Sequence, residues 1–366
     1  MKTSLVIGLG FGDEGKGRTV SYLTSLNPDA LVVRFNGGHQ AGHTVVHKGN
    51  RHVCSSFGAG TLQGVPTLWS RYCTFYPTAV VNEYEILKTT ARPQLFVDPL
   101  CPVTTPFDVD SNRAEESMKF HGSVGVGFGA TIKRHESFYK LYFQDLYYDS
   151  ILNAKLDYIM KNYYHITYLN DTMLEHKAQF LKDVETIRHY RWLRPANQLN
   201  INRFEQVIFE GAQGILLDMD FGFFPHVTRS NTTSKNAIAL IKELGLPEPD
   251  IYYVTRAYQT RHGNGFMTNE DKVPKLVNNE HETNRSDGFQ GKFRISMLDS
   301  ELLNYALRCD NHFTKGMHKH LVMTCLDQRD PVYYGMYILL ELDTDFKSMF
   351  GSYGAETTSM EVEWRA

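Results

Sequence analysis

The sequence predicts an α/β fold: a P-loop-like, mostly parallel central sheet flanked by helices, with a helical insertion. Three observations indicate this class. Residues 5–7 (LVI) form a short apolar run that ends in a glycine-rich turn. A helix is expected to begin near Lys16, and residues 31–35 (LVVRF) have the composition of a second buried strand. Strand, glycine loop, helix and strand in this order are typical of the opening of a parallel sheet.

Three later segments have the composition of further strands of this sheet. Residues 206–210 (QVIFE) precede a second glycine turn, and residues 251–254 and 321–324 are similarly apolar. Between the first and second halves of the chain, residues 137–200 are rich in Tyr, Leu and Lys and favour helix. We therefore predict one large domain over residues 1–366, with a helical insertion at 137–200.

Composition excludes several classes of protein. The chain has 366 residues, 42% of them hydrophobic and 22% charged, which supports a sizeable core and argues against disorder. Lys and Arg total 38 against 41 Asp and Glu, so neutralisation of a nucleic-acid backbone is not expected to be its main work. The five cysteines include no CxxC pair, which predicts neither a disulfide framework nor a zinc knuckle. With no apolar run of about 18 residues, we expect a cytoplasmic protein that makes no membrane contact.

The glycine-rich turn predicts a phosphate-binding loop. Residues 10–15 satisfy G-x-G-x-x-G, but Arg34 stands near the end of the second strand, where a nicotinamide dehydrogenase needs a ribose-binding acid. Residues 10–16 also fit G-x-x-x-x-G-K, although Gly17 occupies the Ser/Thr position of a P-loop. Both patterns share the same physics: backbone N–H groups, a helix N-terminus and the charge of Lys16 all attract phosphate.

Asp13 is the unusual member of this loop. A carboxylate inside a phosphate-binding loop repels its ligand unless a cation lies between them or the carboxylate handles a proton. The loop therefore predicts two roles for Asp13, as a Mg²⁺ ligand and as a general base.

Five motifs follow one another over most of the chain: residues 12–17 (GDEGKG), 37–44 (GGHQAGHT), 209–214 (FEGAQG), 225–233 (PHVTRSNTT) and 256–261 (RAYQTR). Together they resemble the adenylosuccinate synthetase family. The resemblance implies a purine-nucleotide ligase, acting as a homodimer, that joins the amino group of L-aspartate to C6 of a 6-oxopurine monophosphate. A nucleoside triphosphate is cleaved in the process, with Mg²⁺ as cofactor.

The resemblance also implies roles for single residues. Asp13 would remove the proton from purine N1, so that O6 attacks the donor phosphate, and His43 would protonate or hydrogen-bond the transferring phosphoryl oxygen. Mg²⁺ would bind the Asp13 carboxylate and the Gly42 carbonyl. The implied nucleotide-binding residues are Gly12, Glu14, Gly15, Lys16, Gly17, Gly42, Thr44, Asp327, Ser352 and Gly354. The implied substrate-binding residues are Gln40, Ala41, Ser123, Val124, Gln213, Thr228, Gln290, Gly291 and Arg294.

Several segments depart from the family pattern. Residues 123–130 (SVGVGFGA) replace the monophosphate loop TTGRGIGP, and residues 287–294 retain only two cations of the aspartate loop. The arginine that the family lends across its dimer falls near Phe138, where Lys133, Arg134 or His135 are the candidate substitutes. Cys325 replaces the lysine beside Asp327 in the guanine-binding run. Gln40 stands where the family usually carries Asn.

The sequence leaves alternatives open. The retained loop, base and acid favour the ligase reaction with IMP; the short chain and the rebuilt monophosphate loop instead resemble the phage branch that uses dGMP. That branch often replaces the loop carboxylate with Ser, whereas this chain has Asp13. The donor is GTP, ATP or dATP, and the source is a bacterium or a phage-infected host. A nucleotide-binding regulator with little turnover is the alternative from another class.

Overall fold

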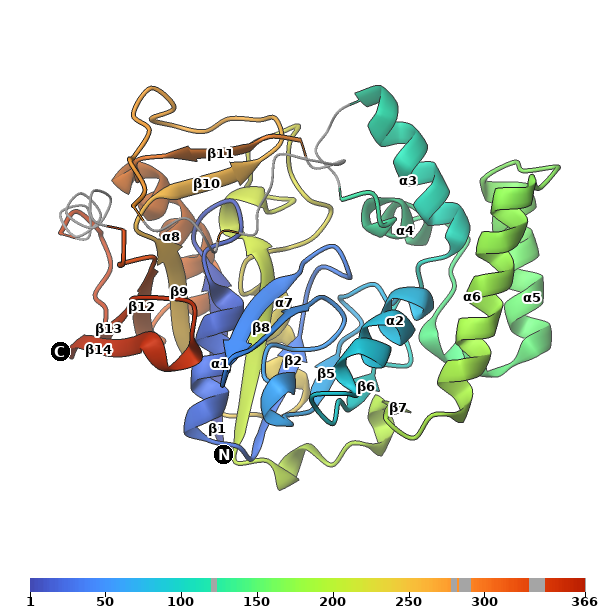
Figure 1. Ribbon diagram of the computed structural model, residues 1–366, viewed down its shortest axis with the longest axis horizontal. Coiled ribbons are helices and arrows are strands. Elements are labelled where there is room, and N and C mark those ends of the chain that lie inside the picture. Colours follow the sequence, from blue (N-terminus) through green and yellow to red (C-terminus); the bar gives the residue numbers. More distant parts are fainter. Residues whose placement is uncertain (120–123, 278–281, 283–290, 329–339, 366) are drawn as a thin grey trace.

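A ten-stranded sheet forms the centre of the molecule (Figure 1). The computed structural model describes residues 1–119, 124–277, 282, 291–328 and 340–365. Neighbouring strands run parallel except β13 and β14, so the predicted fold class is confirmed. In spatial order the strands are β14 (Met360–Arg365), β13 (Ser348–Ser352), β12 (Lys319–Thr324), β9 (Asp250–Arg256), β1 (Lys2–Gly8), β8 (Gln206–Gly214), β2 (Ala30–Arg34), β5 (Thr67–Trp69), β6 (Leu95–Val97) and β7 (Leu193–Pro195).

Helices cover both faces of the sheet because successive strand residues point to opposite sides. In β1, Leu5 and Ile7 pack in one core cluster with residues of α7 and α8, whereas Val6 packs in another with residues of α1. The helices are α1 (Lys16–Leu26), α2 (Pro77–Leu87), α3 (Pro106–Lys119), α4 (Phe128–His135), α5 (Asp149–Tyr158), α6 (Asp171–His189), α7 (Lys235–Glu243) and α8 (Ser300–Thr314). Among the described residues, no helix is long and apolar enough to cross a membrane.

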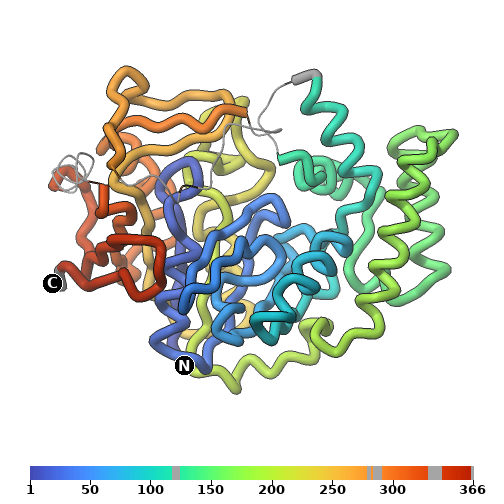
Figure 2. The backbone as a smooth tube through the Cα atoms, viewed as in Figure 1, coloured from blue at the N-terminus to red at the C-terminus, as the bar shows by residue number. Residues whose placement is uncertain are grey.

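Residues 137–200, where the sequence predicts a helical insertion, contain the helices α5 and α6 and, near their end, the strand β7. These two helices extend to the side of the molecule opposite β12–β14, and the chain then returns toward β8 and the N-terminus (Figure 2). On the way, β7 joins the sheet as its edge strand, paired with β6. The strand is only three residues long and ends in Pro195, which an edge strand tolerates because one of its sides needs no N–H donors. Such a short strand lacks the alternation that would distinguish it from helix in the sequence.

The loops that carry the predicted motifs follow the carboxyl ends of β1, β2, β8, β9 and β12. In a parallel sheet these ends share one edge, where ligands bind in α/β proteins. Two antiparallel hairpins stand beside the sheet, formed by β3 (His43–His47) with β4 (Asn50–Cys54) and by β10 (Gln259–His262) with β11 (Phe293–Ser296). The sequence predicts neither hairpin, because the strands are short and carry many polar residues.

Candidate active site

The glycine loop after β1 has an unusual backbone. Gly12, Asp13 and Gly15 all have positive φ, at 100°, 62° and 98°. Aspartate is one of the few residues with a side chain that tolerates this region. The loop is fixed from outside, since Thr324 Oγ1 donates a 2.7 Å hydrogen bond to the Glu14 carbonyl and the Arg256 Nε–H donates to the Asp13 carbonyl. Asp13 is therefore held at the tip of a braced loop.

The side chain of Glu14 fills the inside of this loop. Its Oε1 accepts hydrogen bonds from the N–H groups of Gly10 (3.0 Å) and Gly12 (2.8 Å), and its Oε2 pairs with the Lys16 ammonium. Glu14 and Lys16 are both buried. The sequence predicts that Lys16 offers its charge to phosphate, whereas the structure pairs it with Glu14. The N–H groups of the first turn of α1 have no partner within the helix and are the donors left for a phosphate.

Asp13 lies against a histidine that the sequence did not single out. Its Oδ2 is 3.3 Å from Nε2 of His262, at the end of β10, and 31% of its side chain is exposed. Burial raises the pKa of Asp13, but the hydrogen bond to His262 and the charge of Arg256 outweigh it and hold this pKa below its usual value. Asp13 is thus ionised at neutral pH, as both a metal ligand and a proton acceptor require.

His43 is oriented by a buried carboxylate. Its Nδ1 pairs with Oε1 of Glu210 in β8, and Glu210 Oε2 accepts a 3.0 Å hydrogen bond from the Ala59 N–H. Burial lowers the pKa of His43, which favours the neutral ring. Burial raises the pKa of Glu210, but its pairing with His43, the charge of Arg34 and the hydrogen bond from Ala59 lower it below its usual value. An ionised carboxylate only accepts hydrogen bonds, so Nδ1 carries a proton, and Nε2 is the ring nitrogen that can act on a substrate.

The contact between β3 and α1 explains a departure from the P-loop pattern. A Cβ built on Gly17 would lie 2.5 Å from the Cβ of His43. A Ser or Thr at position 17 is therefore excluded by the close approach of His43. The same packing places Gly42, the residue before His43, next to the start of α1.

Two glutamine amides are buried without a hydrogen-bond partner in the described part of the chain. The atoms without a partner are Oε1 and Nε2 of Gln40 and Oε1 of Gln213. Gln213 also has a positive backbone φ of 60°. The loops of the two glutamines are joined by Asn36, whose side chain makes hydrogen bonds of 2.7 and 3.0 Å with the backbone of Ala212. Gln213 also lies next to the glycine loop, since a Cβ on Gly12 would be 3.8 Å from its Cα. Unpaired buried amides are costly unless a ligand satisfies them, so these residues are candidate ligand contacts.

The loop that carries Thr228 is built around one buried carboxylate. Asp218 accepts hydrogen bonds from the N–H groups of Thr232 and Thr233, and the Thr228 N–H bonds to the Leu217 carbonyl at 2.9 Å. Thr228 is half-buried, and its backbone is held in place by this hydrogen bond.

Of the residues predicted to hold aspartate, Arg294 is already paired. It donates to Glu270 at 2.9 Å and to the Gly265 carbonyl at 2.8 Å. Gly291 packs closely, with its built Cβ 3.3 Å from the Cα of Gly263. Val124 is half-buried in the segment between α3 and α4. Ser123 and Gln290 lie outside the described residues.

The predicted donor-base residues come together at the ends of β12 and β13. The Leu326 N–H donates a 3.0 Å hydrogen bond to the Ser352 carbonyl, which joins the two strand ends beside Asp327. Asp327 is half-buried, and Gly354 follows two residues after Ser352. On the other side, Thr44 is half-buried in β3 and Ala41 is buried just before it.

Two of the three candidates to replace the arginine that the family lends across its dimer, Arg134 and His135, make hydrogen bonds within this chain. Arg134 is fully buried and donates hydrogen bonds of 2.9 and 2.8 Å to Asp108. Burial lowers the pKa of His135 to about 3, and its ring accepts from the backbone of Leu141. The side chain of Lys133 is 55% exposed, and Phe138 is wholly exposed.

Comparison with known proteins gives a consistent result. A family model described as adenylosuccinate synthetase matches residues 5–332. The adenylosuccinate synthetase of Alkalilimnicola ehrlichii is 34% identical over 75% of this chain and 67% of its own length. That of Pseudomonas fluorescens is 33% identical over 84% of this chain and 74% of its own length. The matched regions thus span about two thirds to three quarters of these relatives.

Two solved structures share the fold over nearly the whole chain. The fully ligated adenylosuccinate synthetase of Plasmodium falciparum has a TM-score of 0.74 at 18% identity, covering 100% of both chains. The succinoaminodeoxyadenylate synthetase of cyanophage S-2L, solved with dGMP and with dATP as energy donor, has a TM-score of 0.67 at 15% identity. It covers 99% of this chain and 95% of the phage chain.

The family model and the sequence relatives identify the family of this chain, and the solved structures share its fold. This chain belongs to the adenylosuccinate synthetase family, whose ligases form a C–N bond between L-aspartate and C6 of IMP with cleavage of a nucleoside triphosphate.

Proposed function

We propose that this protein joins L-aspartate to C6 of a 6-oxopurine monophosphate, with IMP as its substrate and a Mg²⁺-bound nucleoside triphosphate as donor. One observation carries the proposal: an ionised, half-exposed Asp13 stands on the glycine loop beside Gln213, whose buried Oε1 has no partner among the described residues. A proton acceptor and a base-binding amide at one place suit a purine whose N1 proton must be removed.

The geometry supports a two-step mechanism. Asp13 takes the N1 proton, and the electron pair moves to O6, which attacks the terminal phosphorus of the donor as the bond to the diphosphate leaving group breaks. His43 donates from Nε2 to the transferring phosphoryl oxygen once its ring carries a second proton, and the Glu210 carboxylate at Nδ1 stabilises that imidazolium. The amine of aspartate then adds to C6 and loses a proton, and phosphate leaves with O6. Gln40 and Gln213 hold the 6-phosphoryl and the base.

The donor atoms fit Mg²⁺, which prefers oxygen ligands. The ionised Asp13 carboxylate and the Gly42 carbonyl would hold the ion, next to the N–H groups that begin α1. Bound there, Mg²⁺ neutralises charge on the donor phosphates. We further propose that the enzyme is a homodimer that works in the cytoplasm of a bacterium or of a phage-infected host. The exposed Phe138, near the position of the family's dimer arginine, supports the homodimer.

A second candidate substrate is dGMP, which would give the 2-amino analogue of the product. The phage enzyme that matches this fold over 95% of its length binds dGMP and dATP. The altered residues 124–130, where Val124 and Val126 stand in place of a hydroxyl and a cation of the family, support a changed nucleotide site. Parallel assays with IMP and dGMP at equal concentration distinguish the two substrates.

We expect phosphate release to depend on both co-substrates. Transfer needs an ionised O6 as acceptor, and the 6-phosphoryl intermediate is consumed only by aspartate. Phosphate should therefore form with Mg²⁺, donor, purine monophosphate and aspartate together, and only at background rate when the purine nucleotide or aspartate is left out. Equal hydrolysis without both would contradict the ligase proposal, and nucleotide binding without any turnover would favour the regulator.

We expect the choice between GTP and ATP to be weak. Cys325 replaces the lysine beside Asp327. Guanine can still donate to the Asp327 carboxylate, but it no longer packs against the aliphatic part of a lysine. The amino group of adenine can reach the same carboxylate. Measurable turnover with ATP or dATP is the expected result, from kcat/KM of each donor at saturating aspartate. A preference for GTP above about 10⁴-fold, the range of strong polar discrimination, would rule this out.

A further inference from the structure

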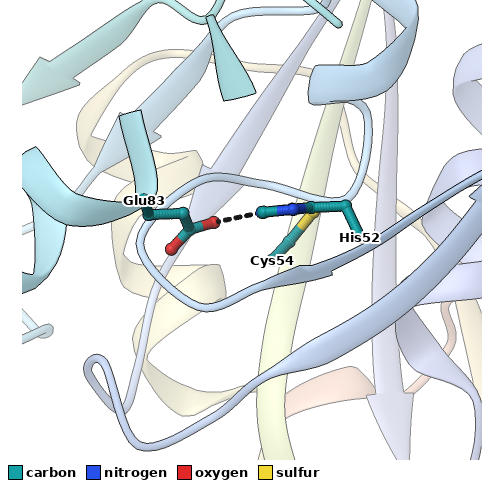
Figure 3. Close-up of side chains that lie close together, drawn as sticks. All are labelled: His52, Cys54 and Glu83. Carbon is teal, nitrogen blue, oxygen red and sulfur yellow. Dashed lines mark hydrogen bonds and ion pairs between the residues drawn. The ribbon is translucent and has the colours of Figure 1, made fainter. Parts of the chain in front are cut away.

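Three side chains of metal-binding type meet between β4 and α2 (Figure 3). His52 and Cys54 come from β4 and Glu83 from α2, and one ligand atom of each lies within 4.8 Å of the others. Residues of this kind, an imidazole, a thiol and a carboxylate, are the protein ligands of Zn²⁺.

The strand explains how two of the ligands come to share one face. His52 and Cys54 are two residues apart in β4, so their side chains point to the same side, toward Glu83. Val53 between them points the other way and is 42% exposed. The pairing is therefore a property of the strand itself and needs no special loop.

Glu83 is fixed before any ion binds. Its carboxylate accepts hydrogen bonds from the N–H groups of Ser55 (3.1 and 3.2 Å) and Ser56 (2.6 Å). It also accepts from Nε2 of His52 at 3.1 Å, so that nitrogen carries a proton. The backbone bonds act as an outer shell that holds the carboxylate in one orientation, as outer partners do in known metal sites.

We propose that His52, Cys54 and Glu83 form a binding site for a Zn²⁺-class transition-metal ion. In a tetrahedral zinc site, nitrogen and oxygen ligands about 2.0–2.1 Å from the metal are about 3.3 Å apart. The 3.1 Å separation of His52 Nε2 and Glu83 Oε1 is already close to this value. The ion displaces the thiol proton to solvent and takes the place of the Nε2 proton, while Nδ1 gains a proton, so that the imidazole stays neutral.

The surroundings keep the thiol protonated while no ion is bound. The Cys54 thiol is fully buried, and burial together with the nearby carboxylates of Glu83 and Glu210 raises its pKa, while Arg34 acts in the opposite sense. The thiol is therefore neutral until a metal ion displaces its proton. His52 has 12% of its side chain exposed and gives the site its contact with solvent, from which water can supply a fourth ligand.

The site has a structural consequence for the active site. Cys54 pairs directly with His43 across the β3–β4 hairpin, and Glu83 belongs to a helix outside it. A bound ion would therefore fasten the hairpin that carries His43 to α2. It is separate from the oxygen ligands proposed for Mg²⁺, which does not favour thiolate.

Cobalt(II) titration of the metal-free, reduced full-length protein tests the proposal, because Co²⁺ reports a thiolate ligand by a charge-transfer band in the near ultraviolet. We expect one equivalent per chain, a band that excess Zn²⁺ abolishes and excess Mg²⁺ leaves intact, and a rise in the thermal midpoint on binding. Cys54→Ala should lose the band, and His52→Gln should weaken binding by at least about tenfold.

Matched controls separate the site from adventitious binding. Cys309→Ala changes another buried cysteine, in α8, and His47→Gln changes another histidine of the same hairpin. Both should bind Co²⁺ as the native protein does. The absence of a thiolate band in the native protein, or its persistence at unchanged affinity in a folded Cys54→Ala, would overturn the proposal. If Cys54→Ala does not fold, unchanged Co²⁺ affinity in His52→Gln, at a partly exposed position, would overturn it equally.

Discussion

Replacing Asp13 with Asn should abolish ligation while leaving the fold intact. An amide can neither accept the N1 proton nor offer a charged oxygen to Mg²⁺, and the general-base contribution alone is about 10²–10⁴-fold in rate. Asn tolerates the left-handed backbone at this position, where φ is 62°, so the loop should keep its shape. The measurement is kcat for product formation at saturating substrates, together with the thermal midpoint.

A suitable control for Asp13→Asn is Asp343→Asn. Asp343 is a carboxylate with 58% of its side chain exposed, paired with Arg308 on the surface. The same chemical change there should leave kcat within about twofold, because surface substitutions have small effects. A near-native rate for Asp13→Asn would show that another group, of which His262 is the nearest candidate, removes the proton.

Replacing Glu210 with Gln should produce the second large loss of activity. The negative charge of the carboxylate stabilises the protonated His43 ring that donates from Nε2, whereas a neutral amide lacks that charge. Loss of the orienting carboxylate in a serine protease lowers kcat about 10⁴-fold, and we expect a reduction of about 10²–10⁴-fold here. The effect should appear in kcat, with KM for the purine nucleotide little changed.

Glu243→Gln is the corresponding control. Glu243 is a surface partner of Arg71 with 49% of its side chain exposed, and its change should alter neither kcat nor KM. If Glu210→Gln instead raised KM and left kcat unchanged, Glu210 would serve to shape the binding site and not to orient His43. A folded variant with native kcat would likewise contradict the orienting role.

The sequence was sufficient to predict the parallel sheet and the loops that meet at its edge. The strands at 5–7, 31–35 and 206–210 carry apolar residues on both faces. This pattern predicts a parallel sheet that is buried between two layers of helices. The short strand β7 was mistaken for helix because three residues show no periodicity. The family motifs named Asp13 and His43, and their roles stay predictions.

What the sequence could not predict were contacts between distant segments. Glu210 and His43 are separated by 167 positions, and His262 reaches Asp13 from a hairpin whose strands are only four residues long. Neither pairing leaves a local pattern in the sequence. The same is true of Glu83, which meets His52 from a helix 31 positions away. Such pairs depend on how the elements pack, and only the fold shows them.

The carboxylate of Glu14 has a consequence for the thermodynamics of nucleotide binding. In a P-loop without such a residue, the empty loop must be ordered by its ligand, and fixing each residue costs about 1–2 kcal/mol of conformational entropy. Here an internal anion already satisfies the N–H groups of Gly10 and Gly12 and the charge of Lys16. The loop is therefore preorganised. A nucleotide binds to a loop in which these groups are already paired, so little of its binding free energy is spent on ordering the loop.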